Sequence, residues 1–143
     1  MARVIETSVL IKAPPSRVWS VLMDFAAYPS WNPFIRSLSG EKRVGASLEV
    51  VIAPPGSKPQ TFKPVVIELV AERGFGWRGA LPIPGLFAGE HRFALAEEAS
   101  GTRFTQSEAF SGLLVPIFGS ILEATQRGFR AMNDELKARS ENQ

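Results

Sequence analysis

The chain has 143 residues, 45% of them hydrophobic and 21% charged, which is typical of one globular domain and excludes charge-driven disorder. Sixteen basic residues against fourteen acidic ones leave a net charge of +2, and the basic residues are scattered, so we expect no nucleic-acid partner. With no cysteine and one histidine, the chain has neither a disulfide framework nor the ligands of a usual zinc site, so we expect no metal and a reducing, cytoplasmic location.

The first part of the chain predicts a strand followed by helical turns. Residues 3–12 alternate apolar and polar side chains, which indicates a strand whose odd positions face inward. The sequence Pro-Pro-Ser at 14–16 stops this strand, and apolar residues at helical spacing in 18–22 predict a short helix that ends near Asp24. We expect two short helices after the first strand. The segment 28–33 is expected to be a loop, because each of its prolines disfavours helix in the preceding residue.

Short alternating segments predict most of the remaining strands. They lie at 34–39, 47–53, 62–71, around Trp77, and at 88–97 and 102–110. A three-residue loop at 72–74, with glycine in the left-handed position, predicts a hairpin in which Leu69 lies opposite Trp77 without a bulge. Because about seven strands are joined by short turns, we expect antiparallel pairing.

The proline-rich segment 81–86 predicts a stiff apolar loop. Residues 113–139 carry apolar side chains in steps of three and four and predict one amphipathic helix about 40 Å long. We expect the loops at 81–86 and 28–33 to flank the opening of the interior, although a docking patch for a protein partner explains them too. No membrane span or export signal is expected.

Five stretches of sequence resemble a known family. They are 11–19 (IKAPPSRVW), 28–34 (YPSWNPF), Trp77-Arg78-Gly79, 89–93 (GEHRF) and 106–112 (QSEAFSG). They are similar to the SRPBCC superfamily of START and birch-pollen-allergen-like proteins, in its polyketide cyclase/dehydrase-like branch. The resemblance covers nearly the entire chain. It implies a single α+β domain over 1–143 with the helix-grip fold, in which a curved antiparallel sheet of about seven strands wraps around a long C-terminal helix.

The resemblance also implies a cavity for an apolar small molecule between the sheet and the helix. We expect it to be lined by Trp31, Phe34, Trp77, Phe93, Gln106, Phe110, Leu114, Phe118, Leu122 and Phe129. For each of these residues an ordinary place in the hydrophobic core is the alternative. The chain lacks the histidine and cysteine ligands of the Rieske domains found in oxygenase members, and no cofactor is expected. Strand alternation directs Arg78 to solvent.

His91 and Glu108 are the most informative polar residues. If the last hairpin turns about residues 99–100, His91 lies opposite Glu108 and Phe93 opposite Gln106, and the apolar faces of both strands coincide. Cross-strand neighbours have Cβ atoms about 5 Å apart, so an imidazole and a carboxylate can exchange a hydrogen bond and act as a catalytic acid and base. A purely structural polar pair is the alternative.

Three functions are compatible with this sequence. The first is a carrier or sensor of a lipid-like or polycyclic molecule, oriented by His91, Gln106 and Glu108. The second is a cofactor-free cyclase, dehydratase or isomerase in which His91 and Glu108 move protons. The third is an interaction module whose apolar loops bind a protein partner.

Overall fold

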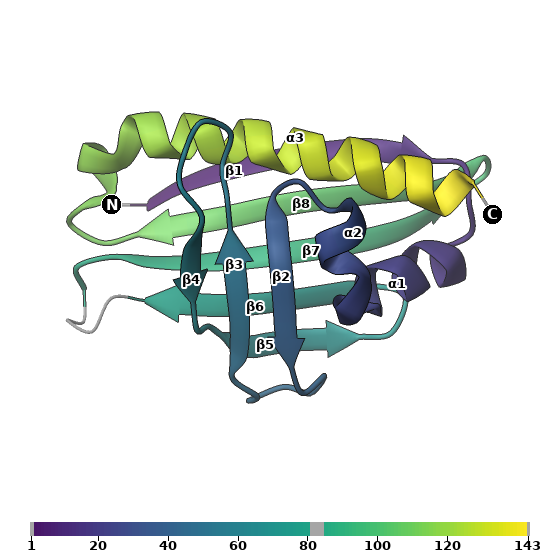
Figure 1. The fold of residues 1–143 in the computed structure, drawn as a ribbon, viewed down its shortest axis with the longest axis horizontal. Coiled ribbons are helices and arrows are strands. Elements are labelled where there is room, and N and C mark those ends of the chain that lie inside the picture. Colours follow the sequence, from purple (N-terminus) through teal and green to yellow (C-terminus); the bar gives the residue numbers. More distant parts are fainter. Residues whose placement is uncertain (1, 81–84, 143) are drawn as a thin grey trace.

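The computed structural model describes residues 2–80 and 85–142, apart from the side chains of Ala2 and Phe118. The helices and strands are, in chain order, β1 (Ala2–Ile11), α1 (Pro15–Met23), η1 (Phe25–Ala27), α2 (Tyr28–Trp31), β2 (Ile35–Gly40), β3 (Leu48–Ile52), β4 (Gln60–Phe62), β5 (Val65–Val70), β6 (Gly74–Ala80), β7 (Ala88–Glu98), β8 (Gly101–Ser111), η2 (Val115–Phe118) and α3 (Gly119–Glu141). The long helix α3 runs beside β1, roughly along the strands of the larger sheet and at a steep angle to β2, β3 and β4 (Figure 1). Within the described ranges, no helix is both long and apolar enough to cross a membrane.

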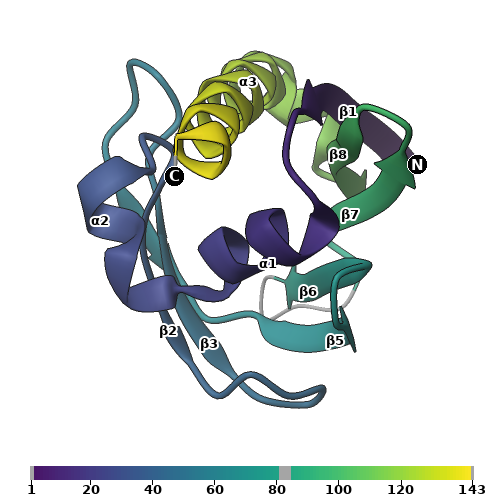
Figure 2. The same ribbon diagram turned by 90° about the vertical axis from the view of Figure 1, so that its right-hand side faces the viewer.

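The strands form two antiparallel sheets that join into one curved surface. The larger sheet has the order β1-β8-β7-β6-β5, and the smaller one has the order β2-β3-β4. Backbone bonds from Leu48 N to the Pro64 carbonyl (2.8 Å) and from Val66 N to the Ala46 carbonyl (2.9 Å) link β5 to the start of β3. Viewed from the end, the strands curve around α1 and α3 (Figure 2). This arrangement confirms the predicted α+β helix-grip fold.

The predicted strand at 62–71 is interrupted at residues 63–64. Its first part, β4, pairs with β3, and its second part, β5, pairs with β6. Pro64 has no amide hydrogen to donate to a ladder, so the chain changes partner at this point. The break makes a corner between the two sheets.

The two hairpins of the larger sheet differ in how well the sequence predicted them. The β7–β8 register is confirmed, with His91 opposite Glu108 and Phe93 opposite Gln106. The predicted β5–β6 register is wrong, because a bulge between Val66 and Glu68 places Trp77 opposite Val66. The left-handed residue of that turn is Glu72, with φ of 63°, and not the glycine at 74.

Two helical predictions also need correction. The segment expected to be a loop at 28–33 begins with the single helical turn α2, in which Pro29 occupies the first turn, where a missing amide hydrogen is tolerated. The C-terminal helix was predicted from residue 113, but α3 starts at Gly119 and is preceded by the 3-10 turn η2, which contains Pro116.

The inward face of α3 fills the space over the sheet. Its buried residues are Leu122, Ala124, Thr125, Gly128, Phe129, Met132, Asn133, Leu136 and Ser140. At Gly128 the helix has no room for a side chain, because an added Cβ would lie 2.3 Å from Cδ1 of Phe34. The aromatic ring of Phe34 thus takes the place of a side chain on α3.

The end of α3 is hydrogen-bonded to the residue that follows β1 and to α1. The carboxylate of Glu141 accepts a hydrogen bond from the backbone amide of Lys12 (2.7 Å), and Arg17 donates to the carbonyl oxygens of Arg139 and Ser140. Hydrogen bonds from Lys137 and then from the Lys12 amide lower the pKa of Glu141 below its usual value.

Tyr28 anchors α2 in the core. Its side chain is fully buried, and its hydroxyl donates a hydrogen bond of 2.7 Å to the carbonyl oxygen of Leu22. Burial raises the pKa of Tyr28 far above its usual value, and the nearby carboxylate of Asp24 adds to the effect.

Candidate functional site

His91 lies at the centre of the molecule, between the larger sheet and α3. The residue has no exposed surface, and aromatic rings surround its imidazole. The ring centroids of Phe93, Trp77, Phe129 and Phe34 lie 4.7, 4.9, 5.0 and 6.5 Å from that of His91. The two nitrogens of this imidazole therefore depend on a few polar side chains for hydrogen bonds.

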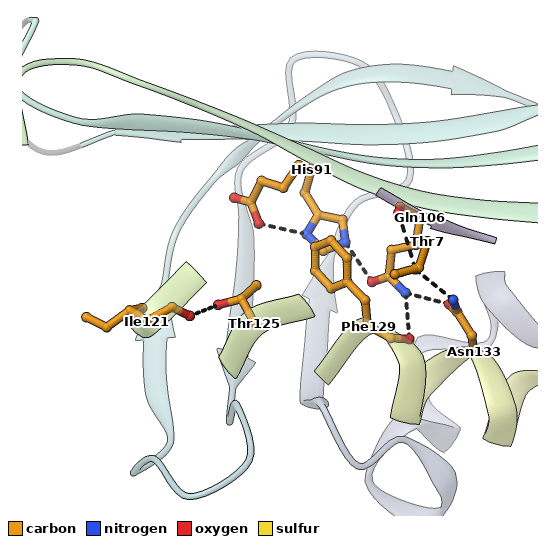
Figure 3. Close-up of polar contacts among 8 residues, drawn as sticks. Thr7, His91, Gln106, Ile121, Thr125, Phe129 and Asn133 are labelled. Atoms are coloured by element: carbon orange, nitrogen blue, oxygen red, sulfur yellow. Dashed lines mark hydrogen bonds and ion pairs between the residues drawn. The ribbon is translucent and has the colours of Figure 1, made fainter. Parts of the chain in front are cut away.

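A chain of buried amide and hydroxyl groups leads away from one side of the imidazole (Figure 3). Nε2 of His91 lies 2.9 Å from Oε1 of Gln106, and Nε2 of Gln106 donates to Oδ1 of Asn133 over 2.8 Å. Nδ2 of Asn133 in turn donates to Oγ1 of Thr7, also over 2.8 Å. These four residues come from β7, β8, α3 and β1, so the chain connects the helix to three strands.

Glu108 lies on the other side of the imidazole. Its Oε1 is 3.3 Å from Nδ1 of His91, which is within ion-pairing distance. The two atoms are not aligned as a hydrogen bond, and Nδ1 is a buried nitrogen without a hydrogen-bond partner among the described residues. The carboxyl group is seated against Gly89, where an added Cβ would lie 2.4 Å from its Oε2. The glycine therefore makes room for the acid.

Most residues predicted to line a cavity are packed as core. Those that are buried are Phe34, Trp77, Phe93, Gln106, Phe110, Leu122 and Phe129, whereas Leu114 is half-buried. Trp31 is also half-buried and packs against Tyr28 in α2, with ring centroids 5.2 Å apart. The side chain of Phe118 and residues 81–84 of the predicted lid lie outside the described residues. Arg78 is exposed, as predicted, and pairs with Glu90.

Two hollows of the described part of the structure lie at its surface. One, of about 410 Å³, is bordered by residues 6–9 of β1 and by Arg130, Asn133 and Asp134 of α3. Another, of about 470 Å³, lies between α1 and the end of α3. The middle of the interior, where the cavity was expected, is occupied by the aromatic rings around His91.

Apolar side chains are exposed at the start of α3. Leu113, Ile117 and Ile121 are 78%, 70% and 53% exposed. Backbone hydrogen bonds from Leu113 and the following residue to the carbonyl oxygens of residues 85 and 86 bring the second half of the predicted lid loop against this segment. These three exposed aliphatic residues, four positions apart along the chain, form an apolar rim.

The sequence predicted the pairing of His91 with Glu108 but not the residues that hold the two side chains in place. Asn133 follows Phe129 by four positions in the apolar stripe of α3, and an amide at such a position signals a buried polar contact. Thr7 gives the same signal in β1, where it occupies an inward position between Ile5 and Val9. Gly89 carries no such signal, because its role depends on the carboxyl group across the strand.

Several solved structures share this fold. The di-domain ARO/CYC BexL from the BE-7585A biosynthetic pathway has a TM-score of 0.79 and 17% identity, covering 99% of this chain and 51% of that one, so the present chain spans about half of BexL. The Zhui aromatase/cyclase from Streptomyces sp. R1128 has a TM-score of 0.78 and 18% identity, covering 99% and 94%. A START superfamily protein from Mycobacterium smegmatis has a TM-score of 0.73 and 19% identity, covering 96% and 97%.

Sequence comparison places the chain in a family. Among curated proteins, none matches the chain. The sequence profile of the family described as polyketide cyclase / dehydrase and lipid transport matches residues 2–141. The structural neighbours lie in the START/SRPBCC superfamily, as the sequence motifs predicted. The chain therefore belongs to the polyketide cyclase / dehydrase and lipid transport family.

Proposed function

We propose that the chain binds an apolar or aromatic small molecule, as a carrier or sensor, between the sheet and the first turns of α3. The molecule enters past the apolar rim, and its polar group meets Glu108. The observation that carries this proposal is the partial exposure of Glu108. Gln106 and Phe110, on the same inward face of β8, are 0% and 6% exposed, whereas the side chain of Glu108 between them is 17% exposed.

The position of Glu108 explains why this exposure matters. Alternate residues of a strand face the same side of a sheet, so Glu108 points toward the interior and not toward the outer face. A carboxyl group in such a place needs a partner or solvent, because burying an unpaired charge is costly. The exposed part of the Glu108 side chain is in contact with solvent, and a ligand can follow the path that solvent takes.

The apolar rim supplies a reason for an apolar ligand. Its three residues come from the segment that precedes α3 and from the first turn of that helix. Aliphatic side chains around an opening favour partition of a nonpolar molecule, at about 25 cal/mol per Å² of apolar surface removed from water. The chain belongs to a family whose description includes lipid transport, which agrees with a nonpolar ligand.

Binding of the uncharged fluorophore N-phenyl-1-naphthylamine tests the proposal. We expect an increase in its fluorescence with the wild-type protein, and weaker binding by Ile121→Ser. Val70→Ser is the matched control, because Val70 is also an exposed aliphatic residue, at 48%, but lies on β5. A fluorophore that does not bind, or that binds both variants as it binds wild type, would contradict the proposed site.

A second function, dehydration of a β-hydroxy ketone, is favoured by the unpartnered Nδ1 of His91 beside Glu108. In this reaction one member of the pair takes a proton from the carbon next to the carbonyl. A proton from the pair goes to the leaving hydroxyl group, water departs and a carbon–carbon double bond forms, so no cofactor is consumed.

Conversion of 4-hydroxy-4-phenylbutan-2-one to its conjugated ketone, followed by ultraviolet absorbance, tests this second function. We expect Glu108→Gln to abolish the conversion and Glu90→Gln to leave it unchanged, because Glu90 pairs with Arg78 and Arg92 outside the site. Equal rates with and without protein would eliminate this function for this substrate class and leave the binding proposal intact.

A further inference from the structure

The inner face of the larger sheet carries side chains in rows that run across the strands. Alternate residues of each strand face the same side, so the register fixes which residues share a row. Trp77 of β6 lies opposite His91 of β7, which lies opposite Glu108 of β8. The next row, toward the end of β6, contains in order across β6, β7, β8 and β1 the residues Gly79, Gly89, Phe110 and Arg3. Its first two positions form a glycine pair, Gly79 and Gly89, where two neighbouring strands present bare backbone.

The glycine pair interrupts a surface that is otherwise aromatic. On the same face, the ring centroid of Trp77 lies 5.4 Å from that of Phe75 and 5.5 Å from that of Phe93. Along β6 the next position on this face is Gly79, roughly 7 Å beyond Trp77, and across the strands the row continues from Gly89 to Phe110, roughly 5 Å away. A ring placed over the glycine pair would therefore have aromatic neighbours on two sides.

The usual structural reasons for a glycine in a strand do not apply at Gly79. The register of β6 with β7 runs from residue 74 to residue 80 without a bulge. The backbone of Gly79 does not have a positive φ. Among the described residues, an added Cβ would meet only Cβ of Pro64, at 3.8 Å, which is ordinary contact. Because a glycine weakens the interior of a strand, its presence here needs another reason, and close approach of a ligand to the backbone is a known one.

Two polar groups of opposite charge type flank the glycine pair. The carboxyl group of Glu108 occupies the space of the missing side chain at Gly89. Arg3 ends the row on β1, and its side chain is exposed, with Nη1 4.0 Å from the position of an added Cβ on Gly119, the first residue of α3. A hydroxyl group on a bound ring can donate to a carboxyl oxygen or accept from a guanidinium group. Both groups can therefore contact such a ring.

We infer that a planar aromatic ring of the ligand lies on the glycine pair and completes the aromatic surface between Trp77 and Phe110. A planar ring can contact the bare backbone over its whole face, whereas the axial hydrogens of a saturated ring hold its carbon skeleton farther away. The site therefore selects flat rings over saturated rings of the same skeleton, and Gly79 is a specificity-determining residue. This inference rests on the proposed function, because it specifies the shape of the molecule that enters past the apolar rim.

Isothermal titration calorimetry of the full chain with two alcohols tests the selectivity. The probes are 2-naphthol and trans-decahydro-2-naphthol, which share a carbon skeleton and a hydroxyl group and differ in flatness. We expect 2-naphthol to bind about two- to tenfold more tightly, because aromatic rings in contact contribute more than the area they bury. Equal affinities would overturn the inference and leave the proposed function standing.

Variants of Gly79 test the position of the ring. We expect Gly79→Ala to weaken 2-naphthol binding and Gly79→Val to weaken it further, by at least about fivefold, because the added methyl groups take the space of the ring. Ala96→Val is the matched control, since Ala96 is an exposed alanine on the outer face of β7, and it should bind as wild type does. The urea midpoint of Gly79→Ala should equal or exceed that of wild type, because alanine is favoured over glycine in a strand and has room at this position.

The outcomes separate this inference from the proposed function. If both Gly79 variants bind 2-naphthol as tightly as wild type, the ring does not lie on the glycine pair, and the proposed function stands. A lower urea midpoint for Gly79→Ala would show that the fold itself requires this glycine, which would also overturn the inference. If neither alcohol nor N-phenyl-1-naphthylamine binds to wild type, the proposed function and the inference fail together.

Discussion

Replacing Gly128 by alanine is expected to destabilise the fold, although the same change stabilises most helices. The added methyl carbon would lie 2.3, 2.6 and 3.1 Å from Cδ1, Cε1 and Cγ of Phe34. The ring of Phe34 must move by about 1 Å to reach ordinary contact, since core atoms are close-packed at van der Waals distance. It is 1% exposed and packs edge-on against Phe129, so it has little space in which to move.

The magnitude follows from two opposing terms. Alanine in a helix interior is favoured over glycine by about 1 kcal/mol. Overpacking of a core costs about 1–3 kcal/mol, and an overlap with a rigid ring lies toward the upper end of this range. We therefore expect Gly128→Ala to lower the free energy of unfolding by about 1–2 kcal/mol, which corresponds to a fall in Tm of several degrees.

Urea denaturation of two alanine variants measures this effect. Gly119→Ala is the matched control, because Gly119 also belongs to α3 and its added Cβ would meet only Nη1 of Arg3, 4.0 Å away. We expect this control to be as stable as wild type or slightly more stable. In the double variant Gly128→Ala with Phe34→Leu, the two losses should not add, because the smaller side chain removes the overlap. A Gly128→Ala protein as stable as wild type would refute the reasoning.

Three further variants test other contacts. Tyr28→Phe removes the donor to the Leu22 carbonyl and should lower the free energy of unfolding, measured by urea denaturation, by about 1–3 kcal/mol. Burial raises the pKa of Tyr28, so the stability of the wild type should fall above pH 10, the usual pKa of tyrosine. The absorbance of this single tyrosine should then change only as the protein unfolds. Hydrogen bonding lowers the pKa of Glu141, so the stability that this carboxylate contributes is present above its usual pKa of 4.5 and is lost as the pH falls through its lower pKa in the folded protein. The Tm of Glu141→Gln should therefore fall less steeply with acid than the Tm of the wild type. An unchanged pH profile of Tm would contradict this. Asn133→Leu removes one hydrogen bond from each of two buried partners, Gln106 and Thr7, and should lower the free energy of unfolding by about 2–4 kcal/mol, measured by urea denaturation, whereas an effect below about 1 kcal/mol would show that solvent replaces the amide.

The parts of the fold that the sequence predicted are those with one clear apolar face. In β7 and β8 a slip of one residue would place Phe93 and Phe104 on opposite faces, so the apolar pattern excludes odd shifts, and the assumed turn at residues 99–100 selects the observed pairing among the even ones. The β5–β6 hairpin does not have one clear apolar face. Its residues Val65, Val66 and Ile67 are apolar on both faces, so pattern alone could not reveal the bulge that follows Val66.

Only the contacts of the candidate site that lie within one hairpin were predicted from the sequence. The facing of His91 and Glu108 depends on one hairpin, whereas the contact between Asn133 and Thr7 joins residues 126 positions apart and depends on how α3 packs on β1. The expected central cavity required knowledge of how side chains fill the interior. The rings of Trp77 and Phe129, which were predicted as walls, instead contact His91 directly.

The two ends of α3 are restrained to different degrees. Its last turn is fastened to the chain after β1 and to α1 by Glu141 and Arg17, whereas its beginning carries the exposed Ile121 and follows the 3-10 turn η2. Amide hydrogen exchange should therefore be graded along the helix, slow near Leu136 and fast in the first turns. Because only the C-terminal turn of α3 is held in this way, a small tilt of the helix about that turn would move its N-terminal end away from the sheet without unfolding the rest of the protein.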